Sequence, residues 1–312
     1  MYFPYLRGKQ FDLLAITDCA GMIAKDSRVI PIIEPVRSKT DSLVRVVAYC
    51  REESAPLILI VNPQVGELAK DPSLIRTLIA NKKLLLGAES ILGYIITQRT
   101  TAAAIRSFLS QYEKSNVAFI HRYSFSNPED VRKLFDNHQN IKYQIFTEGT
   151  TGQAYQRVFR DYNRVLIRDG FNKMVKNADY VPDEFFSDLH HTYQDLGMQA
   201  FGDYGPIGKD FYDQGGPAFA VAIHLTYQRD GEDVWIKHFV SDRITTKADP
   251  AGKFMEALEK LIKFLDKNPK VDGCSGCKQF RDYHLAMHFP QLGPVKRQSI
   301  VHHIDLMNRL LG

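Results

Sequence analysis

The stretch Pro56-Leu-Ile-Leu-Ile-Val-Asn62 decides the fold class of this chain. Its five central residues are all apolar and do not alternate with polar residues, which is typical of a strand covered on both faces. Similar runs occur at Ile30–Glu34, Tyr94–Thr97 and Val117–His121. Strands buried on both faces belong to parallel sheets flanked by helices, so the pattern disfavours an antiparallel sandwich.

Eight such runs alternate with segments of helical period along the first 227 residues. The expected strands are Phe11–Thr17, Val29–Glu34, Pro56–Asn62, Ile91–Thr97, Val117–His121, Lys142–Thr147, Arg164–Asp169 and Phe219–Tyr227. The expected helices are Asp18–Lys25, Ser42–Arg51, Pro72–Asn81, Thr101–Tyr112, Pro128–Asn137 and Pro182–Leu196. This repeat predicts an α/β fold, a closed (β/α)8 TIM-like barrel, and the alternative is a doubly wound open parallel sheet with the same local signals.

The pattern changes after residue 227. Asp230-Gly231 lies between the apolar runs Ala218–Tyr227 and Val234–Ser241, which predicts a β-hairpin. Further along, we expect a helix, a loop-rich segment and a closing helix at Pro250–Leu265, Asp272–Pro290 and Val295–Leu311. Since no repeat or flexible linker interrupts the chain, we expect a single barrel-like domain over residues 1–312, with a core at 1–227 and a C-terminal hairpin and helical elaboration at 228–312.

Composition excludes several classes of protein. The chain has 312 residues, of which 24% are charged and 44% apolar, so it is too long and too apolar for a mini-protein or a disordered tail. Its net charge of +4 is too small to indicate nucleic acid or anionic lipid by itself. We find no apolar run of the length that crosses a bilayer, no signal-peptide core and too few cysteines for a disulfide framework, so we expect a cytoplasmic protein without a membrane partner.

Polar residues that end apolar strands are the candidates for chemistry, because the carboxyl ends of parallel strands share one face of the sheet. The candidate catalytic residues supply carboxylate and imidazole groups for acid–base work or for metal binding: Glu34, His121, Asp169 and His224. The candidate ligand-binding residues are Lys9, Asn62, Arg168, Asp203, Tyr204, Lys209 and His238. Alternatively, these side chains only satisfy one another and the backbone of nearby loops.

A glycine-rich stretch runs from Gly202 to Asp210 and is followed by Gly215-Gly216-Pro217. Glycines allow close approach of the backbone, so amide groups here, with Lys209 beside them, are able to hold an anion such as phosphate. Neither a Walker loop nor a dinucleotide-binding GxGxxG motif is present in the sequence. The alternative interpretation is an irregular lid across the barrel mouth.

Histidines and cysteines near the C-terminus suggest metal sites. His224 and His238 are expected to face each other across the hairpin if its register allows, with Asp242 or Asp169 nearby. A second set, Cys274, Cys277, His284 and His288, has spacing compatible with zinc, although the cysteines are equally compatible with reduced, unliganded thiols. We expect one of His302 and His303 to point inward and to make a core or site-rim hydrogen bond.

Several motifs resemble a known family. Tyr2-Phe-Pro-Tyr-Leu-Arg-Gly-Lys9, with Phe11 and Asp12, and Val29-Ile-Pro-Ile-Ile-Glu-Pro35 are similar to the opening of the phage "beta protein" family and its bacterial relatives. Val165-Leu-Ile-Arg-Asp-Gly170 and Ser299-Ile-Val-His-His303 fit the same family, and the similarity runs along the whole chain. The resemblance implies a place beside a nuclease-like gene in mobile or defence-type gene pairs. It implies no activity for individual residues.

Three functions follow as hypotheses. The first is a component of an anti-phage or mobile-element system that binds an anionic ligand, phosphorylated or nucleic acid, at the barrel mouth and acts with a neighbouring nuclease-like protein. The second is a free-standing metal-assisted hydrolase or lyase acting on a small anionic substrate, with a divalent metal such as zinc or manganese as its cofactor. The third is a binding scaffold without catalytic activity. The sequence leaves the substrate and the oligomeric state open.

Overall fold

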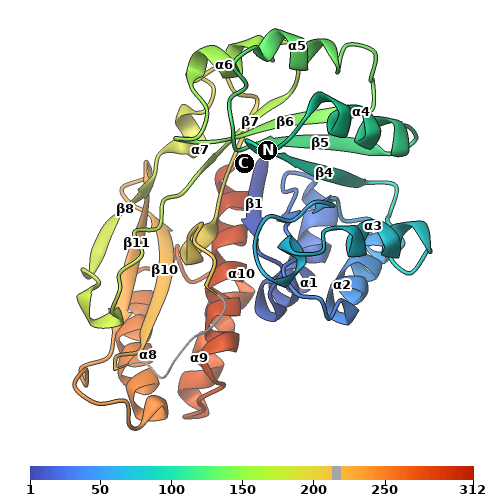
Figure 1. The fold of residues 1–312 in the computed structure, drawn as a ribbon. Helices are drawn as coiled ribbons and strands as arrows, with labels where there is room; N and C mark the ends of the chain where they lie inside the picture. The colour runs from blue at the N-terminus through green and yellow to red at the C-terminus, as the bar shows by residue number, and fades with distance from the viewer. Residues whose placement is uncertain (213–218) are drawn as a thin grey trace. The chain divides into compact units, whose positions relative to one another are not determined.

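The computed structural model describes residues 1–212 and 219–312 and divides them into two compact units. The first unit consists of Met1–Leu13, Ala20–Arg168 and Leu189–Asp203, and the second of Leu14–Cys19, Asp169–Asp188 and Tyr204–Gly312. Figure 1 labels the helices and most of the strands of both units. A grouping by contacts does not define an independently folding domain, so the expected single domain stays a prediction.

The first unit contains a closed barrel in which every strand is parallel to its neighbours. Around the barrel its strands are β1 (Tyr2–Leu6), β2 (Ile32–Ile33), β3 (Leu57–Ile60), β4 (Ser90–Ile96), β5 (Asn116–His121), β6 (Ile141–Thr147), β7 (Arg164–Arg168) and β9 (Ala200–Asp203). The helical segments between them are α1 (Gln10–Asp26), α2 (Asp41–Glu52), η1 (Glu67–Ala69), α3 (Ser73–Ala80), α4 (Ala102–Gln111), α5 (Pro128–Lys133), α6 (Gln153–Val158) and α7 (Leu189–Thr192). This order confirms the predicted (β/α)8 barrel and excludes the open sheet.

The prediction of the first strand is wrong. Phe11–Thr17 lies within helix α1, where Leu13, Ile16 and Ile23 recur at helical spacing and are buried. Gly8 has a φ of +59°, so the chain turns sharply between β1 and α1. The first barrel strand is instead Tyr2–Leu6, all of whose residues are buried.

The prediction of the eighth strand is also wrong. Residues 219–227 contribute to β10 of a separate antiparallel sheet, and the barrel closes through Ala200–Asp203, which pairs with β1 and β7. Gly202 makes this closure possible, because a Cβ atom there would lie 2.0 Å from the carbonyl oxygen of Phe3. The glycine-rich stretch therefore begins as a strand, while Gly215-Gly216-Pro217 lies outside the described residues.

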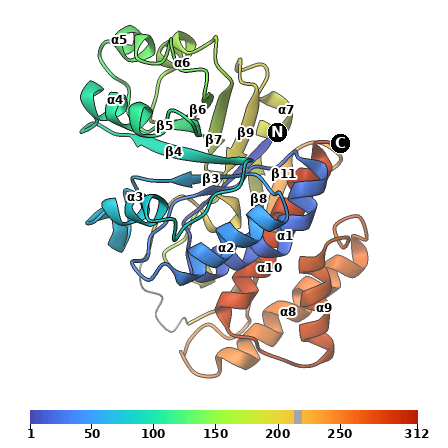
Figure 2. The same ribbon diagram turned by 90° about the vertical axis from the view of Figure 1, so that its right-hand side faces the viewer.

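The second unit contains a three-stranded antiparallel sheet and three long helices (Figures 1 and 2). Its elements are η2 (Asn177–Asp179), β8 (Asp183–Ser187), η3 (Gly205–Ile207), β10 (Ala222–Gln228), β11 (Val234–Val240), α8 (Pro250–Lys267), α9 (Ser275–Leu285) and α10 (Leu292–Leu310). β10 and β11 form the predicted hairpin. The expected helix Pro182–Leu196 is wrong because residues 183–187 pair with β11, and the expected loop Asp272–Pro290 is wrong because it contains α9.

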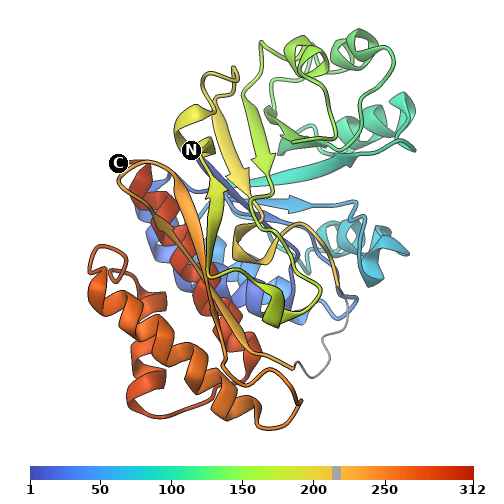
Figure 3. The same cartoon turned by 90° about the vertical axis from the view of Figure 1, so that its left-hand side faces the viewer.

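Helices α8, α9 and α10 share an apolar core with the hairpin, and Figure 3 shows the hairpin strands beside α10. Val221, Ile223 and Leu225 belong to this core. Because successive residues of a strand point to opposite faces, His224 lies on the other face of the sheet. None of the helices in the described parts of the chain combines the length and the apolar character needed to span a membrane.

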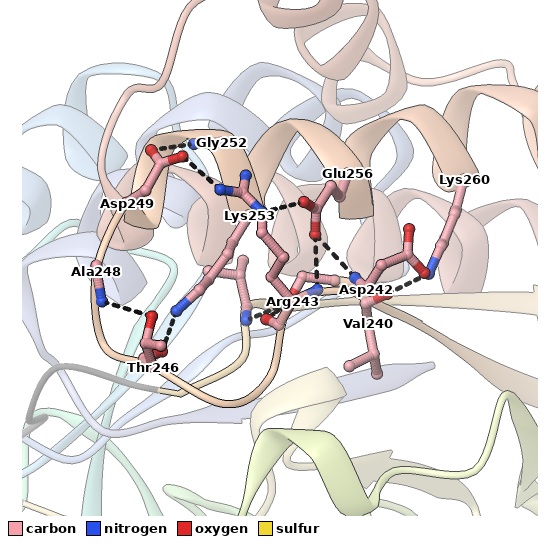
Figure 4. A network of polar contacts seen from close by, with 12 residues as sticks. Val240, Asp242, Arg243, Thr246, Ala248, Asp249, Gly252, Lys253, Glu256 and Lys260 are labelled. Atoms are coloured by element: carbon pink, nitrogen blue, oxygen red, sulfur yellow. Dashed lines mark hydrogen bonds and ion pairs between the residues drawn. The ribbon is translucent and has the colours of Figure 1, made fainter.

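A polar network holds the beginning of α8 (Figure 4). Asp249 caps the helix by accepting a hydrogen bond from the Gly252 amide at 2.8 Å, and Arg243 pairs with both Asp249 and Glu256. One turn further along, Lys260 pairs with Asp242 at 2.7 Å. The predicted neighbour of the histidine pair, Asp242, is therefore engaged with α8.

Candidate functional site

In the first unit, charged side chains from three strand ends converge on Glu34. Glu34 follows β2, Arg7 follows β1 and Arg122 follows β5. The Glu34 carboxylate accepts hydrogen bonds from the Tyr5 hydroxyl at 2.6 Å, from Arg122 Nη2 at 3.0 Å and from the Gln64 amide at 2.8 Å, and it forms an ion pair with Arg7. Since parallel strands end on one face, this cluster lies at the carboxyl ends of the barrel strands.

The cluster keeps a buried carboxylate ionised. Glu34 has no exposed surface, and burial alone would raise its pKa. The charges of Arg122 and Arg7 and the hydrogen bonds from Tyr5 and Gln64 outweigh burial and hold the pKa of Glu34 below its ordinary value. Both guanidinium groups also lie 5.2 Å from the centre of the Tyr5 ring, at cation–π distance. The side chain of Arg122 remains 18% exposed, so among the three charged side chains it is the one that solvent reaches most.

The other predicted residues of the first unit form separate contacts. Arg168 makes a two-point hydrogen bond to Glu148, at 2.8 and 3.0 Å, and Asp203 accepts from the Tyr2 hydroxyl at 2.7 Å. The Asn62 side chain donates to the Ile95 carbonyl oxygen and accepts from the Ile95 amide, so Asn62 joins the end of β3 to β4. The backbone amide of Lys9 donates to Asp12 at the start of α1.

His121 lies in an aromatic pocket of the first unit. Its ring stacks on Phe146 and contacts Phe159, and its two nitrogens bond the Tyr155 hydroxyl at 2.9 Å and the Gln144 side chain at 2.7 Å. Complete burial lowers the pKa of His121 to about 4, so the ring is neutral at pH 7. The side chain of Glu34 is surrounded by charged and polar partners and that of His121 by aromatic rings, so the two candidate catalytic residues lie in different environments of the first unit.

The second unit contains a cavity of about 460 Å³. Its walls come from residues 169–174, which follow β7 in the chain, and from residues 208–210, which follow β9 and η3. Asp169 accepts hydrogen bonds from the amides of Phe171 at 3.3 Å and of Lys209 at 3.2 Å. Burial raises the pKa of Asp169 and outweighs these bonds. The cavity therefore combines a carboxyl group whose pKa is raised by burial with the lysines 173 and 209.

A chain of hydrogen bonds connects the wall of this cavity to the histidine pair. His224 and His238 lie opposite each other in the hairpin register, as predicted, with Nδ1 atoms 2.6 Å apart. His238 Nε2 bonds Glu184 at 3.0 Å, and Glu184 accepts from Asn172, which lines the cavity, at 3.0 Å. The acid beside the pair is thus Glu184, whereas Asp169 lines the cavity.

The chemistry of the pair follows from its surroundings. Burial, and then the neighbouring His238, lower the pKa of His224 well below its ordinary value, and burial also lowers that of His238. Where the Glu184 oxygen accepts from His238 Nε2, the neutral His238 ring accepts at Nδ1, so His224 donates to it through its own Nδ1. The two neutral rings therefore form a directed chain that is able to pass a proton between the hairpin and Glu184. Tyr204, another predicted ligand residue, is buried at the start of η3.

Cys274 and Cys277 lie beside a third metal-ligating side chain. Within the described residues, the group of potential metal ligands consists of Cys274, Cys277 and His302, whose ligand atoms all lie within 4.8 Å of one another. His284 and His288 do not belong to this group. His284 is in the last turn of α9, and His288 lies against the Tyr283 ring.

Three side chains in these contacts were not among the site residues predicted from the sequence. Arg122 directly follows His121, which was predicted. Because neighbouring residues of a strand point to opposite faces, the sequence already indicated that the Arg122 side chain points away from that of His121. Glu184 was hidden because residues 183–187 were assigned to a helix. One of His302 and His303 was expected to point inward, but nothing in the spacing of either from Cys277 indicates which histidine lies beside the cysteines.

Comparisons with known proteins assign neither a family nor a function to this chain. No protein-family model matches the chain, and no curated protein matches it. A crystal structure described as that of a dihydrodipicolinate synthase family protein from Coccidioides immitis is similar over 65% of this chain and 65% of that protein, at 9% identity and a TM-score of 0.39. The chain thus covers less than two thirds of that protein's length.

Proposed function

We propose that the protein binds an anionic ligand, a phosphorylated molecule or a nucleic acid, at the carboxyl ends of its barrel strands. The observation that supports this most is the convergence of Arg7 and Arg122 on the single carboxylate of Glu34. Guanidinium groups present planar forks of donors that suit phosphate oxygens, and they stay charged at every physiological pH. Glu34 and Tyr5 hold the two guanidinium groups in place, so the arginine side chains lose little further conformational entropy when a ligand binds.

Arg122 is the residue whose loss tests this proposal. It is the more exposed of the two arginines and its Nη2 atom already contacts Tyr5 and Glu34. We expect Arg122→Gln to weaken binding at least tenfold, because a charge-assisted bond to an anion contributes about 1.5–3 kcal/mol. Arg106→Gln, a matching change on the exposed face of α4, should leave binding unchanged.

The measurement is calorimetric titration with inorganic phosphate, pyrophosphate, ATP, and short single-stranded DNA and RNA. Binding of an oligonucleotide but not of ATP would assign the ligand to nucleic acid, and the affinity should then fall steeply with salt concentration. Failure of all five probes to bind, or equal affinities for the Arg122→Gln and Arg106→Gln proteins, would contradict the proposal.

The proposed setting is an anti-phage or mobile-element system in which the protein acts with a nuclease-like partner. The resemblance of the segments 2–12, 29–35, 165–170 and 299–303 to the phage "beta protein" family supports this setting. Co-purification with the product of the neighbouring gene, and loss of phage resistance in the Arg122→Gln strain, are the expected results. Resistance that is independent of the neighbouring gene would count against the partnership.

The cavity in the second unit favours a second candidate function, a hydrolase or lyase acting on a small anionic substrate. A volume of about 460 Å³ is within the range of small-molecule sites, and Asp169 with its raised pKa suits a general acid. Glu184, which His238 also bonds, accepts a hydrogen bond from Asn172 and so fixes this amide at the cavity wall as a polar contact for the substrate.

Asp169→Asn tests this second function. Hydrolysis of p-nitrophenyl phosphate and of bis-p-nitrophenyl phosphate should fall by about 100-fold or more, the usual contribution of a general acid. In the wild-type protein the rate should fall as the pH rises past the pKa of Asp169, because only the protonated carboxyl donates. The matching change Asp71→Asn, at an exposed position, is the control. A wild-type protein that binds these esters without cleaving them would favour a binding scaffold.

A further inference from the structure

The structure of the second unit points to a zinc site formed by Cys274, Cys277 and His302, and we propose that this site binds Zn²⁺ with a water molecule as the fourth ligand. The site is separate from the residues of the proposed function. It rests on the geometry of three side chains from the start of α9 and the middle of α10.

The histidine presents the correct atom to the cysteines. His302 Nε2 lies 2.7 Å from the backbone oxygen of Thr226, which has only lone pairs to offer, so Nε2 carries the proton and donates it. Nδ1 is therefore the unprotonated nitrogen of the neutral ring. It lies 3.1 Å from Cys274 Sγ and 3.2 Å from Cys277 Sγ. A histidine whose second nitrogen donates to a backbone carbonyl is the usual arrangement around a protein metal ion.

The distances are close to those of a tetrahedral site. Usual Zn–S and Zn–N bond lengths place a ligand sulfur and a ligand nitrogen about 3.6 Å apart at a tetrahedral angle. Each sulfur of Cys274 and Cys277 would therefore move outward by about 0.4 Å to admit the ion. A rotation of the cysteine side chains supplies such a movement without displacing either helix.

The packing of the two helices supports a built site. Cys277 and His302 are completely buried and Cys274 nearly so, within the apolar core of the second unit. Gly276, between the two cysteines, allows this approach, because a Cβ atom there would lie 2.6 Å from the Gln298 carbonyl oxygen and 3.1 Å from the His302 amide nitrogen. The motif Cys-Ser-Gly-Cys thus brings both sulfurs onto α10.

The open coordination position is assigned to the side of Cys274. This residue lines a cavity of about 370 Å³, together with Asp272, Gly273, Ser275, Lys278 and Arg281. Three protein ligands with one exchangeable water are typical of zinc sites that remain accessible to small molecules, whereas a closed structural site takes four protein ligands.

Metal analysis of the full-length protein tests the proposal. After expression in zinc-supplemented medium and gel filtration, we expect about one zinc ion per chain, the value for a single site of this kind. Cys274→Ser, Cys277→Ser and His302→Ala should each lose most of the zinc, while His284→Ala, His288→Ala and Cys50→Ser should retain it. Loss of zinc from the His284→Ala or His288→Ala protein at the level of His302→Ala would overturn the assignment of ligands.

The wild-type protein gives a test that does not depend on the folding of variants. Replacement of zinc by Co²⁺ should produce a thiolate-to-cobalt charge-transfer band, and azide should change the visible cobalt spectrum by replacing the water. Absence of the band, or a protein that holds no metal and oxidises to a Cys274–Cys277 disulfide, would overturn the metal site. A cobalt spectrum insensitive to azide would overturn the open position.

Discussion

Replacement of Glu34 by glutamine measures how much the ion pairs at the carboxyl ends of the barrel strands contribute to the free energy of unfolding. The change removes the negative charge and keeps the shape of a side chain that has no exposed surface. Arg7 and Arg122 then lose the carboxylate that pairs with both of them. Removing one partner of a buried ion pair costs about 3–5 kcal/mol, and we expect about 3 kcal/mol here because Arg122 retains some contact with water.

Urea unfolding is the assay. With a slope of about 3 kcal/mol per molar urea for a chain of this size, a loss of 3 kcal/mol lowers the midpoint by about 1 M. Glu67→Gln, which removes the exposed carboxylate paired with Arg37, is the matched control and should give a much smaller shift.

The pH dependence separates a charge effect from a packing effect. The pKa of Glu34 is lower in the folded protein than its ordinary value of 4.5, so the folded state binds this proton more weakly than the unfolded state. The stabilisation by the Glu34 charge is therefore complete above pH 4.5 and is lost as the pH falls through the folded pKa. The difference between the wild-type and Glu34→Gln midpoints should shrink between pH 7 and pH 3. A difference that stays constant over this range would refute the electrostatic explanation.

Two further changes test the closure of the barrel and the state of its buried histidine. Gly202→Ala should lower the unfolding midpoint strongly, because its Cβ atom would lie 2.0 Å from the Phe3 carbonyl oxygen, whereas Gly21→Ala, in open space on α1, should be neutral or stabilising. Equal midpoints for the two variants would contradict the pairing of β9 with β1. The ring signals of His121 in NMR should titrate near pH 4, and stability should fall as the pH drops from 6.5 to 4, because only the unfolded chain takes up this proton. Titration near pH 6.5 would show that the ring is not enclosed.

A parallel sheet covered on both faces could be predicted because its central strands are uniformly apolar, and the count of eight strands favoured a closed barrel over an open sheet. Leu57–Ile60 is buried at every position, as the unalternating run requires. The first and last strands were missed for local reasons. Tyr2–Leu6 contains Pro4, which argues against a paired strand, and Ala200–Asp203 is short and contains a glycine. Phe11–Thr17 was assigned to a strand because a short apolar run has no period that separates strand from helix.

The candidate site residues could also be predicted only in part: the sequence indicated individual side chains but not which of them contact each other. Glu34 was found because it ends an apolar strand, and the carboxyl ends of parallel strands share one face of the sheet. Its pairing with Arg7 and Arg122 depends on strand neighbours that only the closed barrel defines. Cys274 and Cys277 were found from their spacing. Their neighbour His302 is 25 residues further along, and its position depends on how closely Gly276 lets α9 approach α10. The sequence spacing between Cys277 and His302 does not indicate that their side chains lie close together.

The proposed zinc site and the histidine chain are joined through one strand. The backbone oxygen of Thr226 accepts a hydrogen bond from His302 Nε2, and Thr226 lies two residues after His224 on β10. An ion that fixes His302 would therefore also fix this strand and the register that places His224 opposite His238. Removal of zinc by a chelator should then shift the ring signals of His224 and His238 while those of His121, in the other unit, stay in place. Unchanged signals for the pair would show that the hairpin register does not depend on the metal.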